Sequence, residues 1–491
     1  MIPERINLAP DLEISRIVTG LWQVADMERG DQDLDLEIAG QALAEYADAG
    51  FDTFDMADHY GSAELIAGHC LNLIDRRRAG TSLPRVFTKW CPTPGPMTRE
   101  IVRAGVQRSM DRLDVEKIDL LQFHWWTFEH TAYLDAMREL QVMKEEGLIG
   151  NIGVTNFNTD HLRVLVSEGI EIITNQICFS LLDRRAADEM STFCLQNDIK
   201  LLTYGTLAGG FLTDKWLGEP NKFAEDIEDW SKMKYRRFID SVGGWDVLQN
   251  ILKALSHVAN KHNVSVANVA TRWVLQQPAV GAIIVGARLG ESQHRDDNLN
   301  ILSFALDDGD MKLISDAYAS SLRIPGDCGD EYRRPPFLTA SGDLSDHLDT
   351  LPKVYSATPV EGKNNRQIID SGSVWEKACG FSRAIRNGNQ ISVSGTTATD
   401  DHGNRVCKGD VAGQTVFILD KIAASISALG GSLSDVTRTR IFMRDANQWE
   451  VVSGVHGRYF ADVRPANTLI GDINLVGDYD VEIEAEAWLD E

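Results

Sequence analysis

The sequence has few cysteines for its length. It contains seven in 491 residues, and no two of them are spaced as C-x-x-C. Domains stapled by disulfides and zinc ribbons both need closely paired cysteines, so neither is expected, and no metal cofactor is predicted. Seven unpaired thiols suit a reducing compartment.

Basic residues are also scarce. There are 48 Lys and Arg against 73 Asp and Glu, a formal net charge of -25. Charge of this sign repels nucleic-acid phosphates and anionic lipid surfaces, so neither is an expected partner. It does not exclude an anionic cofactor, because a few local cations can bind one inside an acidic protein.

Long apolar runs are lacking as well. None approaches the roughly 20 residues that a membrane span needs. The first residues include Glu4, Arg5, Asp11 and Glu13 in place of the apolar stretch of a signal peptide. The sequence therefore predicts a cytoplasmic protein without a membrane segment.

The first two-thirds of the chain alternates short apolar runs with amphipathic stretches. Eight such runs occur: Ile17–Val24, Phe51–Asp55, Val86–Lys89, Ile118–Phe123, Ile149–Val154, Ile172–Gln176, Ile199–Tyr204 and Ala282–Val285. Strands that alternate with helices pair in parallel, and eight of them favour a closed (β/α)8 TIM barrel. The long connection over residues 208–247 is a candidate lid or substrate loop.

The pattern changes after residue 332. Residues 333–353 are rich in Pro, Gly, Ser and Asp and are typical of a linker. Beyond them, strand-like and helical segments follow in a β-α-β-α-β order. We expect a barrel over residues 1–332, a linker over 333–353, and a smaller α+β domain over 354–491.

Polar side chains stand where the predicted strands end, which is where a barrel of this kind builds its active site. Asp55 ends the second strand, Tyr60 follows five positions on, Lys89 ends the third and His124 the fourth. Hydride attack on a carbonyl builds negative charge on its oxygen, which a positioned acid can quench. A Lys89 ammonium held by Asp55 would lower the pKa of the Tyr60 phenol, and His124 would orient the carbonyl oxygen. The set predicts carbonyl reduction.

The segments FDTFDMADHYGSAE, VFTKW, IDLLQFHWW, IGVTNF and TNQ resemble the aldo-keto reductase superfamily in order and spacing, over roughly residues 1–330. The resemblance implies that Asp55, Tyr60, Lys89 and His124 are its catalytic tetrad. It further implies a nicotinamide cofactor. Gly20 is expected near the cofactor and Trp22 near the substrate. Thr155, Asn156 and Gln176 are expected to hold the nicotinamide carboxamide, and Tyr204 is expected to stack on the nicotinamide ring.

Two aromatic residues follow His124. Trp125 and Trp126 are candidates to line an apolar substrate pocket, with core packing as the alternative. Trp125 is the residue we assign to the pocket.

The segment VGARLGESQHRDDNLN resembles the part of the family that grips the adenosine end of the cofactor. Its candidate residues are Gly286, Arg288, Arg295 and Asn298, although Asn298 comes about two residues late, and Met56 stands where the family often has Thr. Arg288 and Arg295 could pair with a 2′-phosphate, which favours NADP(H). No G-x-G-x-x-G stands in a strand-turn-helix setting, so no Rossmann site is expected.

The segments SGSVWEKACGFSRAI, VSGTTATDDHG, GDVAGQT, DVTRTRIFMRD and VEIEAEAW resemble the Rid (reactive intermediate deaminase) family, with a chorismate-mutase-like fold, over about residues 365–491. Family members form trimers with ligand clefts between subunits, which implies a homotrimer. Asn467 stands where imine-hydrolysing members carry Arg, although the acidic Glu482 is present. A neutral amide cannot pair with a carboxylate as a guanidinium does, so this cleft is expected to serve assembly or ligand binding.

The sequence therefore predicts an NADP(H)-dependent enzyme that reduces an aldehyde or ketone, or oxidises the matching alcohol or sugar, with Tyr60 as general acid. Two other hypotheses stay open. The barrel could be a cofactor-loaded redox sensor or scaffold with little turnover, and the fused domain could channel or detoxify a reactive product.

Overall fold

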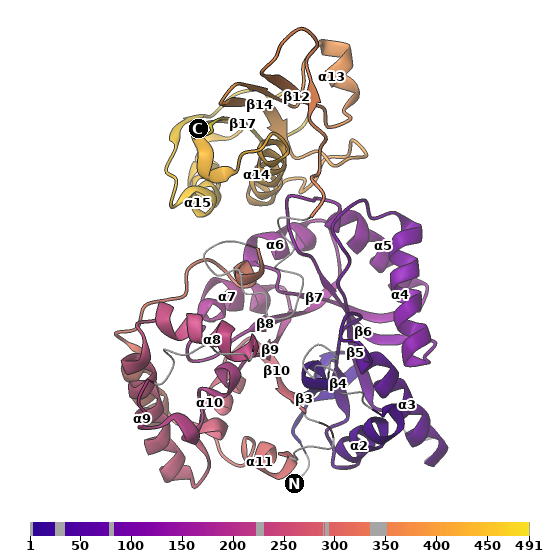
Figure 1. Cartoon of the computed structure of the whole chain (residues 1–491), viewed down its shortest axis with the longest axis vertical. Helices are drawn as coiled ribbons and strands as arrows, with labels where there is room; N and C mark the ends of the chain where they lie inside the picture. The colour runs from indigo at the N-terminus through magenta and orange to yellow at the C-terminus, as the bar shows by residue number, and fades with distance from the viewer. Residues whose placement is uncertain are drawn as a thin grey trace.

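A computed structural model describes residues 3–24, 35–77, 83–221, 230–287, 289, 294–333 and 351–490. Eight parallel strands close into a barrel in the order β10-β3-β4-β5-β6-β7-β8-β9 (Figure 1). Their bounds are β3 Ile17–Gly20, β4 Thr53–Asp55, β5 Arg85–Trp90, β6 Ile118–His124, β7 Ile149–Thr155, β8 Ile172–Cys178, β9 Lys200–Tyr204 and β10 Val280–Gly286. Each predicted run contributes one strand, so the predicted (β/α)8 barrel is confirmed.

Helices surround the barrel. They are α2 Leu36–Asp48, α3 Ala63–Arg77, α4 Arg99–Leu113, α5 Tyr133–Glu145, α6 Thr159–Ser167, α7 Glu189–Gln196, α8 Trp230–Ser241, α9 Trp245–His262, α10 Val266–Leu275, α11 Arg295–Asn300 and α12 Asp308–Tyr318. Local capping fixes several starts: the Asp35 carboxylate accepts from two backbone N–H groups at the start of α2, and Asn158 accepts from the N–H of His161 in α6. The connection over residues 208–247 carries α8 and the start of α9, so part of the candidate lid is helical.

A hairpin that the sequence did not predict closes the amino-terminal end of the barrel. It consists of β1 Arg5–Ala9 and β2 Leu12–Ser15, which pair antiparallel. Leu8, Leu12 and Ile14 pack in one cluster with Phe87 and Leu120 of the barrel strands. Because this end is plugged by side chains, the opening of the barrel lies at the carboxyl ends of the strands.

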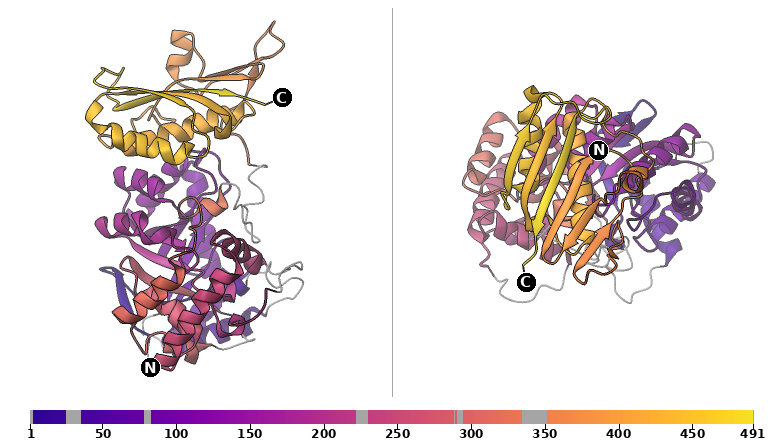
Figure 2. Two further views of the ribbon diagram at one scale, coloured as in Figure 1. Left: turned by 90° about the vertical axis from the view of Figure 1, so that its left-hand side faces the viewer. Right: turned by 90° about the horizontal axis from the view of Figure 1, so that it is seen from above.

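The second domain is a sheet with its two longer helices on one face (Figure 2). Its strands run in the order β11-β12-β13-β14-β17-β15-β16, antiparallel except for the pair β15–β16. The bounds are β11 Thr358–Pro359, β12 Arg366–Ile369, α13 Val374–Cys379, β13 Ala384–Asn387, β14 Gln390–Thr397, α14 Val411–Ala428, β15 Val436–Met443, α15 Trp449–Phe460, β16 Ala466–Ile470 and β17 Val481–Trp488. The predicted smaller α+β domain is confirmed, with extra strands β11 to β13 ahead of the predicted ones.

Helices α14 and α15 lie between this sheet and the barrel, and the opposite face of the sheet is turned away from the barrel (Figure 2). Helix α14 is long and apolar enough to cross a membrane, but almost all of it is buried inside the protein. Its burial between sheet and barrel accounts for its apolar composition.

Polar contacts join the two domains around α6. His161 Nε2 lies 2.8 Å from Asp420 Oδ2 of α14, and Arg458 of α15 pairs with Asp160. Further along the interface, Arg138 Nη1 lies 2.9 Å from Asp400 Oδ2. The barrel helix that follows β7 is thus held directly by the second domain.

Candidate active site

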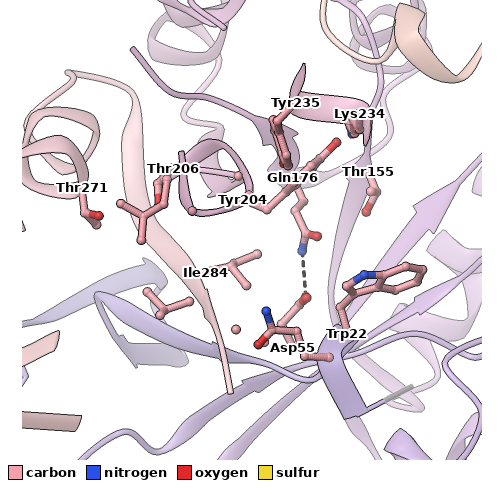
Figure 3. A pocket seen from close by; sticks show the side chains of 18 of the residues that line it. Trp22, Asp55, Thr155, Gln176, Tyr204, Thr206, Lys234, Tyr235, Thr271 and Ile284 are labelled. Carbon is pink, nitrogen blue, oxygen red and sulfur yellow. Dashed lines mark hydrogen bonds between the residues drawn. The ribbon is translucent and has the colours of Figure 1, made fainter. Parts of the chain in front are cut away.

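A cavity of about 630 Å³ opens at the carboxyl ends of the barrel strands. Residues from most strand ends line it, including Gly20, Trp22, Asp55, Tyr60, Lys89, His124, Trp126, Thr155, Asn156, Gln176, Tyr204, Gly286, Asn298 and Tyr332. Figure 3 shows several of these side chains pointing into one space, with Asp55 and Trp22 on one side and Tyr204 and Lys234 on another. The predicted strand-end residues are therefore brought together.

An ion pair forms the floor of this cavity. Lys89 Nζ lies 2.7 Å from Asp55 Oδ2 and donates a second hydrogen bond of 3.0 Å to the Met56 carbonyl. Both side chains are about 95% buried. Asp55 Oδ1 accepts from the side-chain amides of Gln122 at 2.9 Å and Gln176 at 2.7 Å. These hydrogen bonds to Asp55 and Met56 hold the ammonium in one place.

Tyr60 comes from the loop after β4. Lys89 Nζ lies 5.1 Å from the centroid of its ring. The Trp22 ring meets the Tyr60 ring edge-on, with centroids 4.8 Å apart. The contacts with Trp22 and Lys89 position the Tyr60 phenol beside the fixed ammonium of Lys89.

His124 is buried at the end of β6 with its two ring nitrogens in different surroundings. Nδ1 lies 3.1 Å from the Thr155 carbonyl oxygen, and a carbonyl oxygen only accepts, so Nδ1 carries a proton. Burial lowers the pKa of His124 well below its usual value, helped by the nearby charges of Arg333, His59 and Lys89. The neutral ring therefore presents Nε2, which has no hydrogen-bond partner among the described residues, as an acceptor.

This protonation state bears on how His124 would orient a substrate oxygen. A neutral His124 cannot donate to a carbonyl oxygen from Nε2. It can accept from a hydroxyl, either the Tyr60 phenol or a substrate alcohol.

Three residues expected on a nicotinamide carboxamide lie at the ends of β7 and β8. Thr155 Oγ1 is buried without a hydrogen-bond partner among the described residues. Asn156 adopts a left-handed backbone with φ of 56°, and its Oδ1 accepts from the Tyr204 hydroxyl at 2.8 Å. Burial raises the pKa of Tyr204 well above its usual value, so this phenol stays a donor. The Asn156 amide is thereby oriented with its N–H2 group left over.

Gln176 has a narrower role than the sequence suggested. Its Nε2 donates to Asp55 Oδ1 (Figure 3) and to Gln122 Oε1 at 2.9 Å, which uses both donors of the amide. Only Gln176 Oε1 stays open to accept from a ligand.

Of the residues expected at the adenosine end of the cofactor, two line the cavity and one does not. Gly286 and Asn298 line the cavity, as does Gly20, which was expected near the cofactor. Arg295 does not line the cavity, because it donates to the Glu45 carbonyl at 2.7 Å and its guanidinium lies over the Tyr46 ring. Arg288 lies outside the described residues.

The assignment of Trp125 to the substrate pocket is wrong. Its ring is fully buried, stacks on Phe123 and donates to the His130 carbonyl, and it does not line the cavity. Trp126 lines the cavity instead, with its ring 4.2 Å from that of His124. The alternation of sides along β6 continues past its end, so Trp125 lies with Phe123 away from the cavity while His124 and Trp126 face it.

Three residues that take part in the hydrogen-bond networks of this site were not predicted from the sequence. Gln122 precedes His124 by two residues, and this spacing on a strand was a signal that it faces the same interior. Lys234 of α8 and Tyr332, from a turn after α12, gave no comparable signal. Lys234 Nζ donates to the Tyr332 hydroxyl at 2.7 Å, which lies 3.1 Å from the Tyr204 hydroxyl.

The two residues expected in the cleft of the second domain do not meet within one chain. Asn467 donates to Thr439, whose hydroxyl also lies 2.9 Å from His456 of α15, so it belongs to the helix side of the sheet. Glu482 alternates with the buried residues of β17 and therefore lies on the opposite face, beside Gly395.

Comparison with known proteins agrees with this geometry. Residues 16–319 match the family described as Aldo/keto reductase family, and residues 374–489 match Endoribonuclease L-PSP. The NADH-specific methylglyoxal reductase of Escherichia coli (strain K12) is 25% identical over 323 residues, which cover 62% of this chain and 94% of that protein. A RutC family protein of Pyrococcus horikoshii is 32% identical over 108 residues, 22% of this chain and 86% of that protein.

Among solved structures, the glycerol dehydrogenase from Gluconobacter oxydans superposes with a TM-score of 0.51 at 24% identity, covering 67% of this chain and 98% of that chain. This likeness concerns the fold. Since the first family match spans more than half of the chain, the protein belongs to the aldo/keto reductase family and carries a C-terminal domain of the Endoribonuclease L-PSP (Rid) type.

Proposed function

We propose that the barrel reduces a small aldehyde or ketone with NADP(H), or oxidises the matching alcohol or sugar, and that Tyr60 is the general acid. The observation that supports this most is the buried Asp55–Lys89 pair beside the Tyr60 ring. A fixed cation favours the phenolate over the phenol, which makes Tyr60 a better proton donor than a free tyrosine.

The chain's own residues divide the work around the substrate oxygen. Tyr60 gives its proton to that oxygen, and Lys89 stabilises the phenolate left behind. Asp55 keeps Lys89 in position. His124 Nε2 then accepts a hydrogen bond from the new hydroxyl, while Trp22 and Trp126 exclude water from this end of the cavity.

The residues at the ends of β7 and β8 fit a nicotinamide carboxamide. When bound, the dinucleotide supplies the hydride. Asn156 offers amide N–H donors, Gln176 Oε1 offers an acceptor, and Thr155 Oγ1 is a buried hydroxyl without a partner among the described residues. Donors and acceptor match the oxygen and the N–H2 of a carboxamide.

The preference for NADPH over NADH rests on Arg288 alone among the predicted arginines, since Arg295 is directed to Glu45. Arg288→Ala should reduce kcat/KM with NADPH and leave kcat/KM with NADH nearly unchanged. Equal effects on both cofactors would remove the 2′-phosphate role.

The test of the reductase is NADPH oxidation with a panel of aldehydes, ketones and sugars. Tyr60→Phe should lower kcat by about 10²–10⁴-fold, the usual contribution of a general acid. Tyr318→Phe, on α12 outside the cavity lining, is the matched control. Retained turnover in Tyr60→Phe would contradict the assignment, and tight NADPH binding without turnover on any substrate would favour the sensor.

We further propose that the C-terminal domain assembles the protein into a homotrimer and binds a ligand without standard deaminase chemistry, in a cytoplasmic protein. The neutral Asn467 and its contact with Thr439 support this reading, because the position that would pair with an acidic substrate is engaged inside its own sheet. Deletion of residues 354–491 with no change in assembly, activity or product stability would contradict a role for the domain.

A further inference from the structure

Three metal-ligating side chains converge on the wall of the cavity, beside the residues proposed for catalysis. Asp58 and His59 lie in the loop before Tyr60, and Cys91 follows the end of β5. Their ligand atoms all lie within 4.8 Å of one another. His59 and Cys91 both line the cavity. An imidazole, a thiol and a carboxylate from two separate loops therefore face one point.

The spacing of these atoms suits a small tetrahedral ion. Zinc bonds of about 2.0–2.3 Å at tetrahedral angles place neighbouring ligand atoms about 3.3–3.6 Å apart. His59 Nδ1 and Asp58 Oδ1 are already 3.3 Å apart. The Cys91 sulfur lies within 4.8 Å of both of these atoms and supplies the third ligand.

The backbone around the three ligands is held in place. The Asp58 N–H donates to the Lys89 carbonyl at 2.9 Å, and the Cys91 N–H donates to Asp58 Oδ1 at 3.3 Å. Arg112 donates to the Asp58 carbonyl at 2.9 Å. These bonds tie the loop after β4 to the loop after β5, so the ligands do not have to be gathered from mobile segments.

The neighbouring arginine does not occupy the atom that would bind the ion. Arg108 Nη2 lies 3.4 Å from Asp58 Oδ2, and its side chain is more than half exposed. The other oxygen, Oδ1, lies 3.3 Å from His59 Nδ1, accepts from the backbone N–H of Cys91, and lies within 4.8 Å of Cys91 Sγ. Ligating carboxylates are commonly held by an outer donor of this kind, which orients them towards the metal.

We propose that Asp58, His59 and Cys91 bind a thiophilic divalent cation such as Zn²⁺ at the wall of the barrel cavity, and that its occupancy blocks the substrate end of the site. A thiolate and an imidazole select zinc over magnesium or calcium, which prefer all-oxygen ligands. Three protein ligands leave a fourth position open towards the cavity.

The consequence for turnover depends on the proposed reductase function. The His59 ring centroid lies 4.8 Å from that of Tyr60 and 6.3 Å from that of Trp126. An ion on His59 therefore stands at the substrate end of the cavity. With its bound water it would fill the space that the substrate oxygen needs beside Tyr60, so inhibition competes with the carbonyl substrate.

Metal binding is tested without any assay of turnover. Co²⁺ is titrated into the full-length, chelator-treated protein and followed by absorption. We expect one equivalent per chain, with the bands of four-coordinate cobalt and a thiolate-to-cobalt charge-transfer band. Cys91→Ser should remove the charge-transfer band, and His59→Asn should weaken binding at least about tenfold, the loss seen for lesser changes around metal sites.

Cys379→Ser is the matched control, because Cys379 is the exposed cysteine among the seven. It should leave the titration unchanged. A Co²⁺ titration without a charge-transfer band, or with the same band in Cys91→Ser, overturns the site. Circular dichroism of Cys91→Ser and of a second variant, Cys91→Ala, separates loss of a ligand from loss of folding.

Inhibition is tested separately, with each rate normalised to that variant's own metal-free rate. The Zn²⁺ concentration for half-inhibition should rise at least about tenfold in Cys91→Ser. Equal inhibition of both proteins overturns the inhibitory role. If the barrel turns over no carbonyl, the proposed function fails while the cobalt spectrum still decides the metal site.

Discussion

Asp55 connects the groups at the floor of the cavity. One carboxylate oxygen pairs with Lys89, and the other accepts from Gln122 and Gln176. A neutral asparagine at this position would offer one oxygen and one N–H2 group to these three donors, so one donor would lose its acceptor. The position of the Lys89 ammonium thus depends on a carboxylate at this residue.

We therefore expect Asp55→Asn to lower kcat by about 10²-fold or more, while the Kd for NADPH changes much less. Stopped-flow turnover and quenching of tryptophan fluorescence by NADPH would measure the two quantities. Asp52→Asn, near the start of β4 and paired with Arg5 on the surface, is a control that should keep full turnover. A variant of Asp55 with unchanged kcat would show that Lys89 does not need its counter-ion.

The neutral state of His124 predicts a dependence of stability on pH. The folded pKa is lowered by burial, whereas an unfolded histidine titrates near 6.5. The unfolded chain then binds the proton more readily than the folded one. The contribution of His124 to stability is complete above about pH 6.5 and is lost as the pH falls towards the folded pKa.

The difference in free energy of unfolding between the wild type and His124→Asn should therefore shrink between pH 7 and pH 5. Urea unfolding at a series of pH values would measure it. His69→Asn, at an exposed position of α3, is the matched control and should give no such trend. A difference that stays constant with pH would show that His124 does not become harder to protonate on folding.

The site residues that could be predicted from the sequence are those that stand at or next to the end of a barrel strand. Asp55 and His124 end their strands and Lys89 is the last but one residue of β5, so the barrel alone brings them to one edge. Trp125 was misassigned because one further residue decides whether a side chain faces the cavity or the surrounding helices. Arg295 was misassigned because its partner, Glu45, lies 250 positions away in the chain.

At the level of elements, α6 links the cavity to the second domain. Its first turn follows Thr155 and Asn156 of the cavity wall, and its His161 contacts Asp420 of α14. Asp420 Oδ1 also accepts from the Tyr459 hydroxyl of α15 at 2.7 Å. One buried carboxylate of the second domain thus binds both α6 and α15.

Asp420→Asn should lower the free energy of unfolding by about 1–3 kcal/mol, the usual cost of a buried group left without its partner. Arg458→Gln tests a pair at the rim of the same interface, where Arg458 is 42% exposed, and should cost less than about 1 kcal/mol. Urea unfolding would compare the two. A larger loss in Arg458→Gln would mean that the rim, and not the buried contact, holds the domains together.

Among the helices, strands and turns, those encoded by their own local sequence were predicted, and those that depend on contacts with distant residues were missed. The barrel strands were predictable because both of their faces are buried, which makes each one a continuous apolar run. The hairpin β1–β2 was missed because its short strands mix charged and apolar residues. The turn that brings Tyr332 to the cavity was missed because its position depends on packing against Tyr204 and Lys234, which the local sequence does not encode.

On the scale of the whole molecule, the described residues of one chain place no helix over the outer face of strands β15 to β17 (Figure 2). The side chains that alternate outwards on β15, β16 and β17 share this open face: Arg440, Phe442, Ile470, Glu482, Glu484, Glu486 and Trp488. Arg440 pairs there with Glu484 at 2.6 Å. Because the barrel occupies the helix side, this face is the one left for contacts with other copies (Figure 2).

We expect the protein to form a trimer through this open face. Ile470 is 43% exposed there, and an aspartate in its place would put a charge into a contact that excludes water. Ile470→Asp should therefore shift the mass measured by light scattering from three chains towards one. Ile38→Asp changes a side chain that is 66% exposed on α2 of the barrel, and it should leave the mass unchanged. A wild-type protein with the mass of a single chain would contradict assembly through the sheet. A trimer that persists in Ile470→Asp would place the contacts elsewhere on the second domain.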